Sequence, residues 1–102
     1  MIKIANIKKN EPYDLYIGRE NKWLGLPCSK WHNPFILKRE GDRSMILDQY
    51  KNYVISSGLI KDIDELDGFT LGCYCRPKKC HGEILIELFD EKHSIFNDHD
   101  NI

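Results

Sequence analysis

Two segments near the beginning of the chain have the hydrophobic pattern of β-strands. Apolar side chains recur between residues 2 and 7, and they alternate along residues 13–17. Successive side chains of a strand point to opposite faces, so this pattern indicates two short strands with one buried face each. Gly18 follows the second segment and is expected to end that strand.

A helical pattern begins near Asp42, a suitable N-cap residue, and Gly58 is a natural end for it. Apolar side chains at three- and four-residue spacing would share one face of this helix. They are Ile46, Leu47, Tyr50, Tyr53 and Val54. A second, short helix is expected over residues 62–66, where Asp62 and Glu65 have the spacing of a capping pair.

The segment 69–75 carries no charged side chain, which is typical of a central strand. A last helix is expected over residues 83–89 because apolar residues fall on one face there. This order of elements predicts an α/β fold. We expect a small, Rossmann-like sheet of three or four strands, at least partly parallel and flanked by helices. It would form a single domain over residues 1–91, followed by a polar tail over residues 92–102 that frays.

Between the second strand and the first helix, residues 19–42 have no clean periodicity. Irregular stretches of this length are uncommon in compact domains and are often functional. Trp23 and Trp31 lie within this stretch, and either side chain is suited to stacking on a base or another ring. The alternative for each is an apolar cap on the core beside the loop.

Composition and charge indicate which classes of protein this chain can belong to. The chain has 102 residues, of which 41% are hydrophobic and 30% charged, as expected for one globular domain. Its formal net charge is −1. Proteins that bind a nucleic-acid backbone usually have an excess of basic residues, so we do not expect nucleic acid to be a partner. We recognise no secretory signal and no apolar run of about 18 residues. We therefore expect a cytoplasmic protein with reduced thiols and no membrane segment.

Three of the four cysteines crowd into the sequence CYCRPKKCHGE at residues 73–83. In a reducing compartment, clustered Cys and His indicate metal binding or chemistry more often than disulfides. Residues two apart in a strand point to the same face, so Cys73 and Cys75 are expected to project together. Cys80 and His81 follow near the start of the last helix. Three explanations are open for this cluster.

The first explanation is a zinc site, because thiolates and imidazoles are ligands that zinc prefers and a structural site needs four of them. Cys73, Cys75, Cys80 and His81 could be these four, or Cys28 and His32 could contribute from the irregular stretch. The spacing of the first four, C-x-C-x4-C-H, is compressed compared with the usual pair of C-x2–4-C units. The ligand types therefore fit zinc, whereas the spacing does not.

The second explanation is an anion site. Ligands of parallel α/β sheets bind beyond the carboxyl ends of the strands, where a helix N-terminus offers N–H groups and the positive end of its dipole. Arg76 lies at this junction and suits bidentate capture of a phosphate or carboxylate. A cysteine there would also be a nucleophile, with His81 and Glu83 as acid–base partners.

The third explanation is purely structural. Cysteines pack well as small hydrophobic side chains, and Pro77 and Gly82 would then simply shape a turn. Cys73 by itself fits this role best. A plain turn is a weaker explanation for the rest of the cluster, because His and Cys so placed are an unusual choice for a turn.

Several short motifs occur along the chain in a fixed order. They are Tyr16-Ile-Gly-Arg19, Trp31-His-Asn-Pro-Phe35, Arg43 with Tyr50 on the following helix, and the cysteine segment. In this order they resemble a family of small domains of unknown function found in bacteria and their phages, with the pattern IGR…NPF…R…Y…CxCxPxxCHG. The resemblance covers roughly residues 13–90. It implies one shared site containing Arg19, Asn33, Arg43, Cys75, Cys80 and His81, in a bacterial or phage-infected cell.

The chain departs from this family pattern before Asn33, where residues 24–30 widen the loop. Cys28 belongs to this inserted segment. A zinc site that depended on Cys28 would therefore not be a feature of the family.

These observations predict a domain that binds a nucleotide-like or other phosphate-bearing, anionic small molecule at the strand-to-helix junction over residues 75–81. The residues expected to contact the ligand are Arg19, Trp31, Asn33, Arg43, Cys75 and Arg76. If the ligand is turned over, the residues expected to react are Cys80, His81 and Glu83. The alternative is a zinc-stabilised structural or protein-interaction module built on the Cys73, Cys75, Cys80 and His81 cluster.

Overall fold

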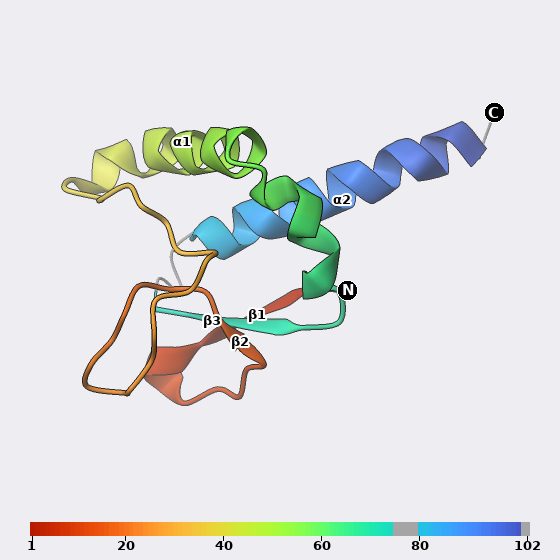
Figure 1. The fold of residues 1–102 in the computed structure, drawn as a ribbon. Helices are drawn as coiled ribbons and strands as arrows, with labels where there is room; N and C mark the ends of the chain where they lie inside the picture. Colours follow the sequence, from red (N-terminus) through yellow and green to blue (C-terminus); the bar gives the residue numbers. More distant parts are fainter. Residues whose placement is uncertain (75–79, 101–102) are drawn as a thin grey trace.

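The computed structural model of the protein describes residues 1–74 and 80–100, with side chains as far as residue 93. One small sheet lies beneath two long helices, which cover the same face of it (Figure 1). This arrangement confirms the predicted α/β fold.

The sheet has three strands, all parallel, in the order β1-β3-β2. They are β1 (Lys3–Asn6), β2 (Leu15–Tyr16) and β3 (Thr70–Cys73). The last strand in sequence therefore lies in the centre, where Leu71 pairs with Ile4 on one side and Leu15 on the other. The lack of charge in this segment agrees with its central place.

Strand β3 presents different faces to the helices and to the opposite side of the sheet. Leu71 and Cys73 are buried in the core under the helices. Gly72 points the other way, and a Cβ atom there would come within 2.7 Å of the Tyr13 ring and 3.0 Å of the Ile7 side chain. Glycine at this position therefore allows the segment between β1 and β2 to cover the second face closely.

The helices α1 (Arg43–Ser56) and α2 (His81–Asp100) pack on each other and on the 3-10 helix η3 (Leu59–Leu66). Two shorter 3-10 helices, η1 (Ile7–Lys9) and η2 (Glu40–Asp42), follow β1 and precede α1. The buried apolar residues of α1, α2 and η3 form one core with β3. They are Leu47, Tyr50, Val54, Ile63, Leu66, Ile84, Leu85 and Leu88. Within the part of the chain that the structure describes, no helix is both long and apolar enough to cross a membrane.

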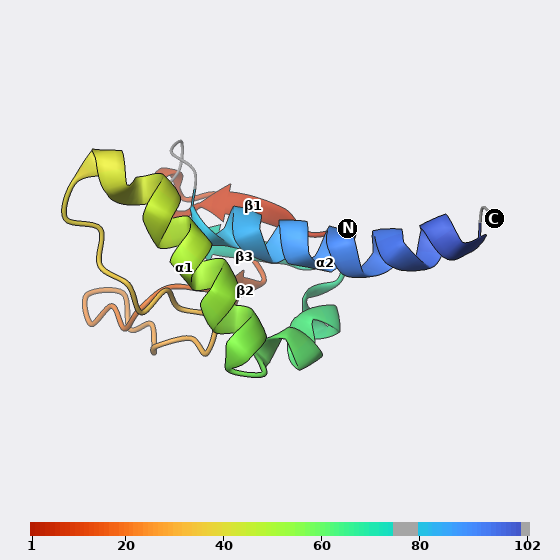
Figure 2. The same ribbon diagram turned by 90° about the horizontal axis from the view of Figure 1, so that it is seen from above.

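Helix α2 corrects the predicted bounds at both ends. It begins at His81, two residues before the predicted start, and continues to Asp100, beyond the predicted end at residue 89. The expected fraying tail is thus helical as far as Asp100, and α2 projects past the sheet (Figure 2). Lys92 and His93 bond the two carboxylate oxygens of Asp64 in η3, at 2.9 and 3.0 Å. These contacts attach α2 to η3 at residues beyond the apolar face of the helix.

Helix η3 also differs from its prediction. It begins at Leu59, directly after Gly58, and the predicted capping pair Asp62 and Glu65 does not cap it. Both carboxylates instead contact Lys30, at 3.2 and 2.8 Å. Polar residues of η3 therefore hold the irregular loop rather than the helix end. Asp42 is the predicted N-cap of α1, but its side chain makes no capping hydrogen bond.

The irregular loop is anchored in the core by Trp31, whose side chain is 1% exposed. The indole N–H donates to Glu65 Oε1 at 3.1 Å, and the Trp31 carbonyl accepts a bond of 2.7 Å from the Tyr50 hydroxyl. Burial raises the pKa of Tyr50, so its hydroxyl remains a donor over the ordinary pH range. Trp31 thus adopts the core role that the sequence left open for it.

We predict that Tyr50→Phe lowers the free energy of unfolding by about 1–3 kcal/mol, because the buried Trp31 carbonyl loses its partner. Urea denaturation followed by circular dichroism measures the change. Tyr53→Phe is the matched control, since Tyr53 is half-buried on the same helix and is expected to change the value by less than about 0.5 kcal/mol. Equal effects of the two substitutions would contradict this assignment.

Candidate functional site

A cavity of about 220 Å³ lies beyond the carboxyl ends of β2 and β3, at the start of α2. Five of the predicted residues line it, although they come from four separate parts of the sequence. They are Arg19, Asn33, Arg43, Cys80 and His81. The parallel sheet brings them together, because the ends of parallel strands and the beginnings of the following helices meet at one edge.

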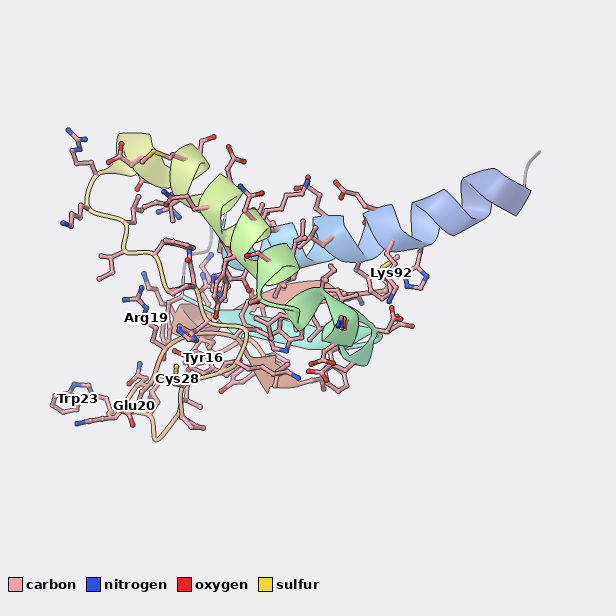
Figure 3. All side chains as sticks on the ribbon, turned by 45° about the horizontal axis from the view of Figure 1, so that its top comes forward. Tyr16, Arg19, Glu20, Trp23, Cys28 and Lys92 are labelled. Atoms are coloured by element: carbon pink, nitrogen blue, oxygen red, sulfur yellow. The ribbon has the colours of Figure 1, made fainter. Side chains whose placement is uncertain are left out.

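Arg19 extends from the residues that follow β2 to one wall of the cavity (Figure 3). Its Nε and Nη2 atoms donate to the Asn33 carbonyl at 3.1 and 2.8 Å. The Asn33 side chain in turn accepts the Phe35 N–H at 3.0 Å, which shapes the turn containing that carbonyl. No carboxylate of the described residues forms an ion pair with Arg19, so its positive charge faces the cavity without a counterion.

The position of Arg19 depends on Gly18 and Tyr16. The Tyr16 hydroxyl donates to the Arg19 carbonyl at 2.5 Å. Burial, and then the neighbouring Tyr74, raise the pKa of Tyr16 and keep this donor protonated. A Cβ atom on Gly18 would lie 2.3 Å from the Tyr16 hydroxyl oxygen. A side chain at position 18 would therefore have to displace the far end of the Tyr16 ring, so Gly18 has a role beyond the strand end that the sequence indicated.

Arg43 is the first residue of α1 and lies on another wall of the cavity. Its Nε and Nη2 atoms bond the two carboxylate oxygens of Glu40 at 3.0 and 3.1 Å. This two-point contact orients the guanidinium and offsets much of its charge. Arg43 therefore adds directed N–H donors to the site, whereas Arg19 adds net positive charge.

His81 is the first residue of α2 and is buried. Its Nε2 atom is 2.7 Å from the Ile17 carbonyl, and the Tyr50 ring packs edge-to-face against the imidazole at a centroid distance of 5.0 Å. A carbonyl can only accept, so Nε2 must carry a proton. Any proton that His81 accepts from a ligand would therefore have to bind at Nδ1.

Gly82 allows the first turn of α2 to approach the sheet this closely. A Cβ atom there would lie 3.0 Å from the Ile17 side chain, 3.2 Å from Ile4 and 3.3 Å from Cys80 Sγ. In dinucleotide-binding α/β folds, a glycine of the phosphate-binding turn likewise allows close packing of helix and strand. The sequence indicated only a turn residue at this position.

Cys80 immediately precedes α2, and Glu83 lies in the first turn of that helix. Glu83 Oε2 accepts the Cys80 backbone N–H at 3.2 Å, which is one half of a capping box. Glu83 does not line the cavity. The structure thus places the predicted acid or base of the site in a capping contact that fixes the start of α2.

The predicted zinc cluster is only partly brought together. Cys73 Sγ and Cys80 Sγ are 3.3 Å apart, but His81 directs Nε2 to Ile17. Cys75 and the predicted anion-binding residue Arg76 lie outside the described residues. Over residues 1–74 and 80–93, no group of three His, Cys, Asp or Glu side chains is placed to hold a metal ion.

The two tryptophans lie apart from the cavity walls. Trp31 is buried in the core, and Trp23 is 98% exposed in the turn that the Asn21–Leu26 bridge closes. Trp23 points away from the body of the protein (Figure 3). The apolar wall of the cavity instead includes Ile36 and Leu37, which sequence reasoning missed because the loop has no periodicity to reveal an inward face.

Comparison with known proteins identifies a family but no activity. The family model "Domain of unknown function (DUF4326)" matches residues 2–91. The uncharacterized protein R718 of Acanthamoeba polyphaga mimivirus is 39% identical over 101 residues, covering 84% of this chain and 78% of that protein. The uncharacterized 12.4 kDa protein in the nrdA-td intergenic region of Enterobacteria phage T4 is 35% identical over 93 residues, covering 86% and 77%. No solved structure shows a significant match.

We predict that Gly18→Ala lowers the free energy of unfolding by about 1–3 kcal/mol, because the added methyl group displaces the Tyr16 ring and breaks its bond to Arg19. Urea denaturation provides the measurement. Gly41→Ala is the control, since a Cβ atom there meets nothing within 4 Å, and it should leave stability unchanged or slightly raised. A Gly18→Ala protein as stable as the Gly41→Ala protein would show that Tyr16 moves without cost.

Proposed function

The chain belongs to the DUF4326 family, and for this member we propose the binding of a nucleotide-like or other phosphate-bearing small molecule in the cavity at the start of α2. The observation that carries this proposal is the position of Arg19. Its guanidinium lines the cavity, is held by the Asn33 carbonyl and has no carboxylate partner among the described residues.

The electrostatics of the cavity favour an anionic group. Arg43 lies on the same cavity and presents a guanidinium that Glu40 orients. Cys80 and His81 add the N-terminus of a long helix, where backbone N–H groups and the helix dipole attract negative charge. These three contributions converge from different directions, which is the arrangement that holds a phosphate in three dimensions.

The rest of the cavity suits an apolar or planar part of the same ligand. Phe35, Ile36 and Leu37 form one wall, and Ile46 and Leu47 of α1 belong to another. The volume of about 220 Å³ is below the ~300–1,000 Å³ of pockets that enclose a drug-sized ligand. We infer that the cavity encloses the phosphate together with only part of the apolar or planar remainder of the ligand.

Turnover of such a ligand would involve Cys80 or His81, because both line the cavity. His81 would act through Nδ1, since Nε2 is bonded to Ile17. Glu83 would act indirectly by fixing the backbone of Cys80. Arg76 and Cys75 are further ligand contacts in this proposal, on the sequence grounds given above.

We predict that adenosine 5′-monophosphate shifts the amide NMR signals of residues around Gly18, Asn33 and His81, and that adenosine shifts them far less. Arg19→Gln should weaken monophosphate binding by about tenfold or more, because a charge-assisted contact to phosphate contributes roughly 1.5–3 kcal/mol. Titration of labelled protein with each compound, and with inorganic phosphate, gives the affinities.

Arg39→Gln is the matched control for this experiment. Arg39 is a surface arginine that is paired with Asp42 at 3.2 Å and does not line the cavity. Its substitution should leave the affinity unchanged. The proposal fails if none of the phosphate compounds shifts these signals, or if the two arginine variants bind equally.

A second candidate is a zinc-stabilised structural or interaction module, which is favoured by the close approach of the Cys73 and Cys80 thiols. Cys75 would be a third ligand, and His81 would have to bind through Nδ1. Structural zinc contributes directly to folding. This candidate requires one zinc ion per chain in the native mass spectrum and unfolding by a chelator, whereas a folded, metal-free chain excludes it.

A further inference from the structure

The thiols of Cys73 and Cys80 form a close, buried pair at the base of the cavity. Their sulfur atoms are 3.3 Å apart, and the two residues are only 2% and 1% exposed. The two are not joined to each other in a disulfide. A disulfide bond is about 2 Å long, so the two sulfur atoms would need to approach by only about 1 Å to be joined.

The two thiols come from rigid elements that already hold them side by side. Cys73 is the last residue of the central strand β3, and Cys80 directly precedes α2. The Cys80 backbone is fixed by Glu83, and the next residue, His81, is bonded to the Ile17 carbonyl. Their contact therefore follows from the packing of α2 on the sheet, whatever ligand the cavity binds.

The two thiols differ in whether they can be reached from the cavity. Cys80 lines the cavity, whereas Cys73 does not. A small oxidant that enters the cavity therefore meets Cys80 first. The thiolate is the form that oxidants attack; a helix N-terminus favours it, whereas burial in an apolar core opposes it. Cys73 does not line the cavity but contacts Cys80. It is therefore placed to act as the resolving thiol, which attacks the oxidised sulfur of Cys80.

We propose that Cys73 and Cys80 are an oxidisable dithiol that hydrogen peroxide converts to a disulfide. The Cys80 thiolate attacks the peroxide O–O bond, giving a Cys80 sulfenic acid and, after proton transfer, water. The Cys73 thiol then attacks the Cys80 sulfur, and the hydroxyl group leaves as a second water molecule. Two thiols are oxidised and one molecule of hydrogen peroxide is reduced to two of water. The product is a covalent link between β3 and the start of α2.

The test uses the full chain with Cys28→Ser and Cys75→Ser, so that Cys73 and Cys80 are the only thiols left. The folded protein is treated with hydrogen peroxide, quenched in acid and alkylated after denaturation. We expect the intact mass to fall by two hydrogen atoms, with no alkylation until a reductant is added.

Two single-thiol variants separate the roles of the cysteines. With Cys73→Ser added, Cys80 should accumulate as the sulfenic acid, which dimedone traps. With Cys80→Ser added, Cys73 should stay reduced, because it does not line the cavity. Circular dichroism shows whether each variant is folded. If either variant fails to fold, peptide mapping of the unaltered chain still decides: Lys78 and Lys79 separate Cys80 from Cys73, and cleavage after Tyr74 separates Cys73 from Cys75.

The inference is overturned if both thiols of the folded protein remain open to alkylation after peroxide. It is also overturned if Cys80 links to Cys28 or Cys75 in the unaltered chain instead of to Cys73. A zinc ion that co-purifies with the chain and protects both thiols from oxidation would equally exclude a redox role and favour the zinc module. None of these outcomes depends on whether the cavity binds a phosphate.

Discussion

The contact between the start of α2 and the end of β2 determines the geometry of the site. His81 donates to the Ile17 carbonyl at 2.7 Å, and Gly82 lets the first turn of α2 lie within van der Waals distance of the sheet. This contact brings the N-terminus of a long helix beside the residues that follow β2. Arg19 is two residues from Ile17, so the helix dipole and the arginine act on the same space.

The polar residues around the cavity have unequal electrostatic roles. Glu40 offsets the charge of Arg43, and Glu83 caps α2 rather than facing a ligand. Among the described residues, Arg19 is held by the Asn33 carbonyl and contacts no carboxylate. A site arranged in this way has one strong anchor for an anion, surrounded by neutral or neutralised donors. In the proposed function, that balance suits the capture of one phosphate more than the neutralisation of a long polyanion.

The irregular loop shows how far local sequence can predict a site. The family resemblance, rather than a local pattern, predicted that Asn33 and Arg19 share a site, and both line the cavity. Trp31 was predicted to contact the ligand, but it is buried and bonded to Glu65 and Tyr50. The same apolar side chain suits a core and a binding surface equally well. Only the position of η3 and α1 around the loop shows which of the two Trp31 occupies.

The sequence by itself determined the fold class and the parallel central strand, because these depend on periodicity and on local residue chemistry. The grouping of the polar residues at the strand ends followed from the family resemblance. Tertiary structure decided the close approach of Cys73 to Cys80, the loss of net charge at Arg43 and the capping role of Glu83. Tertiary structure also showed that α2 continues to Asp100 and that Lys92 and His93 of this helix contact Asp64. The physical reason is that each of these depends on distances between segments far apart in the chain, which packing sets and local patterns do not encode.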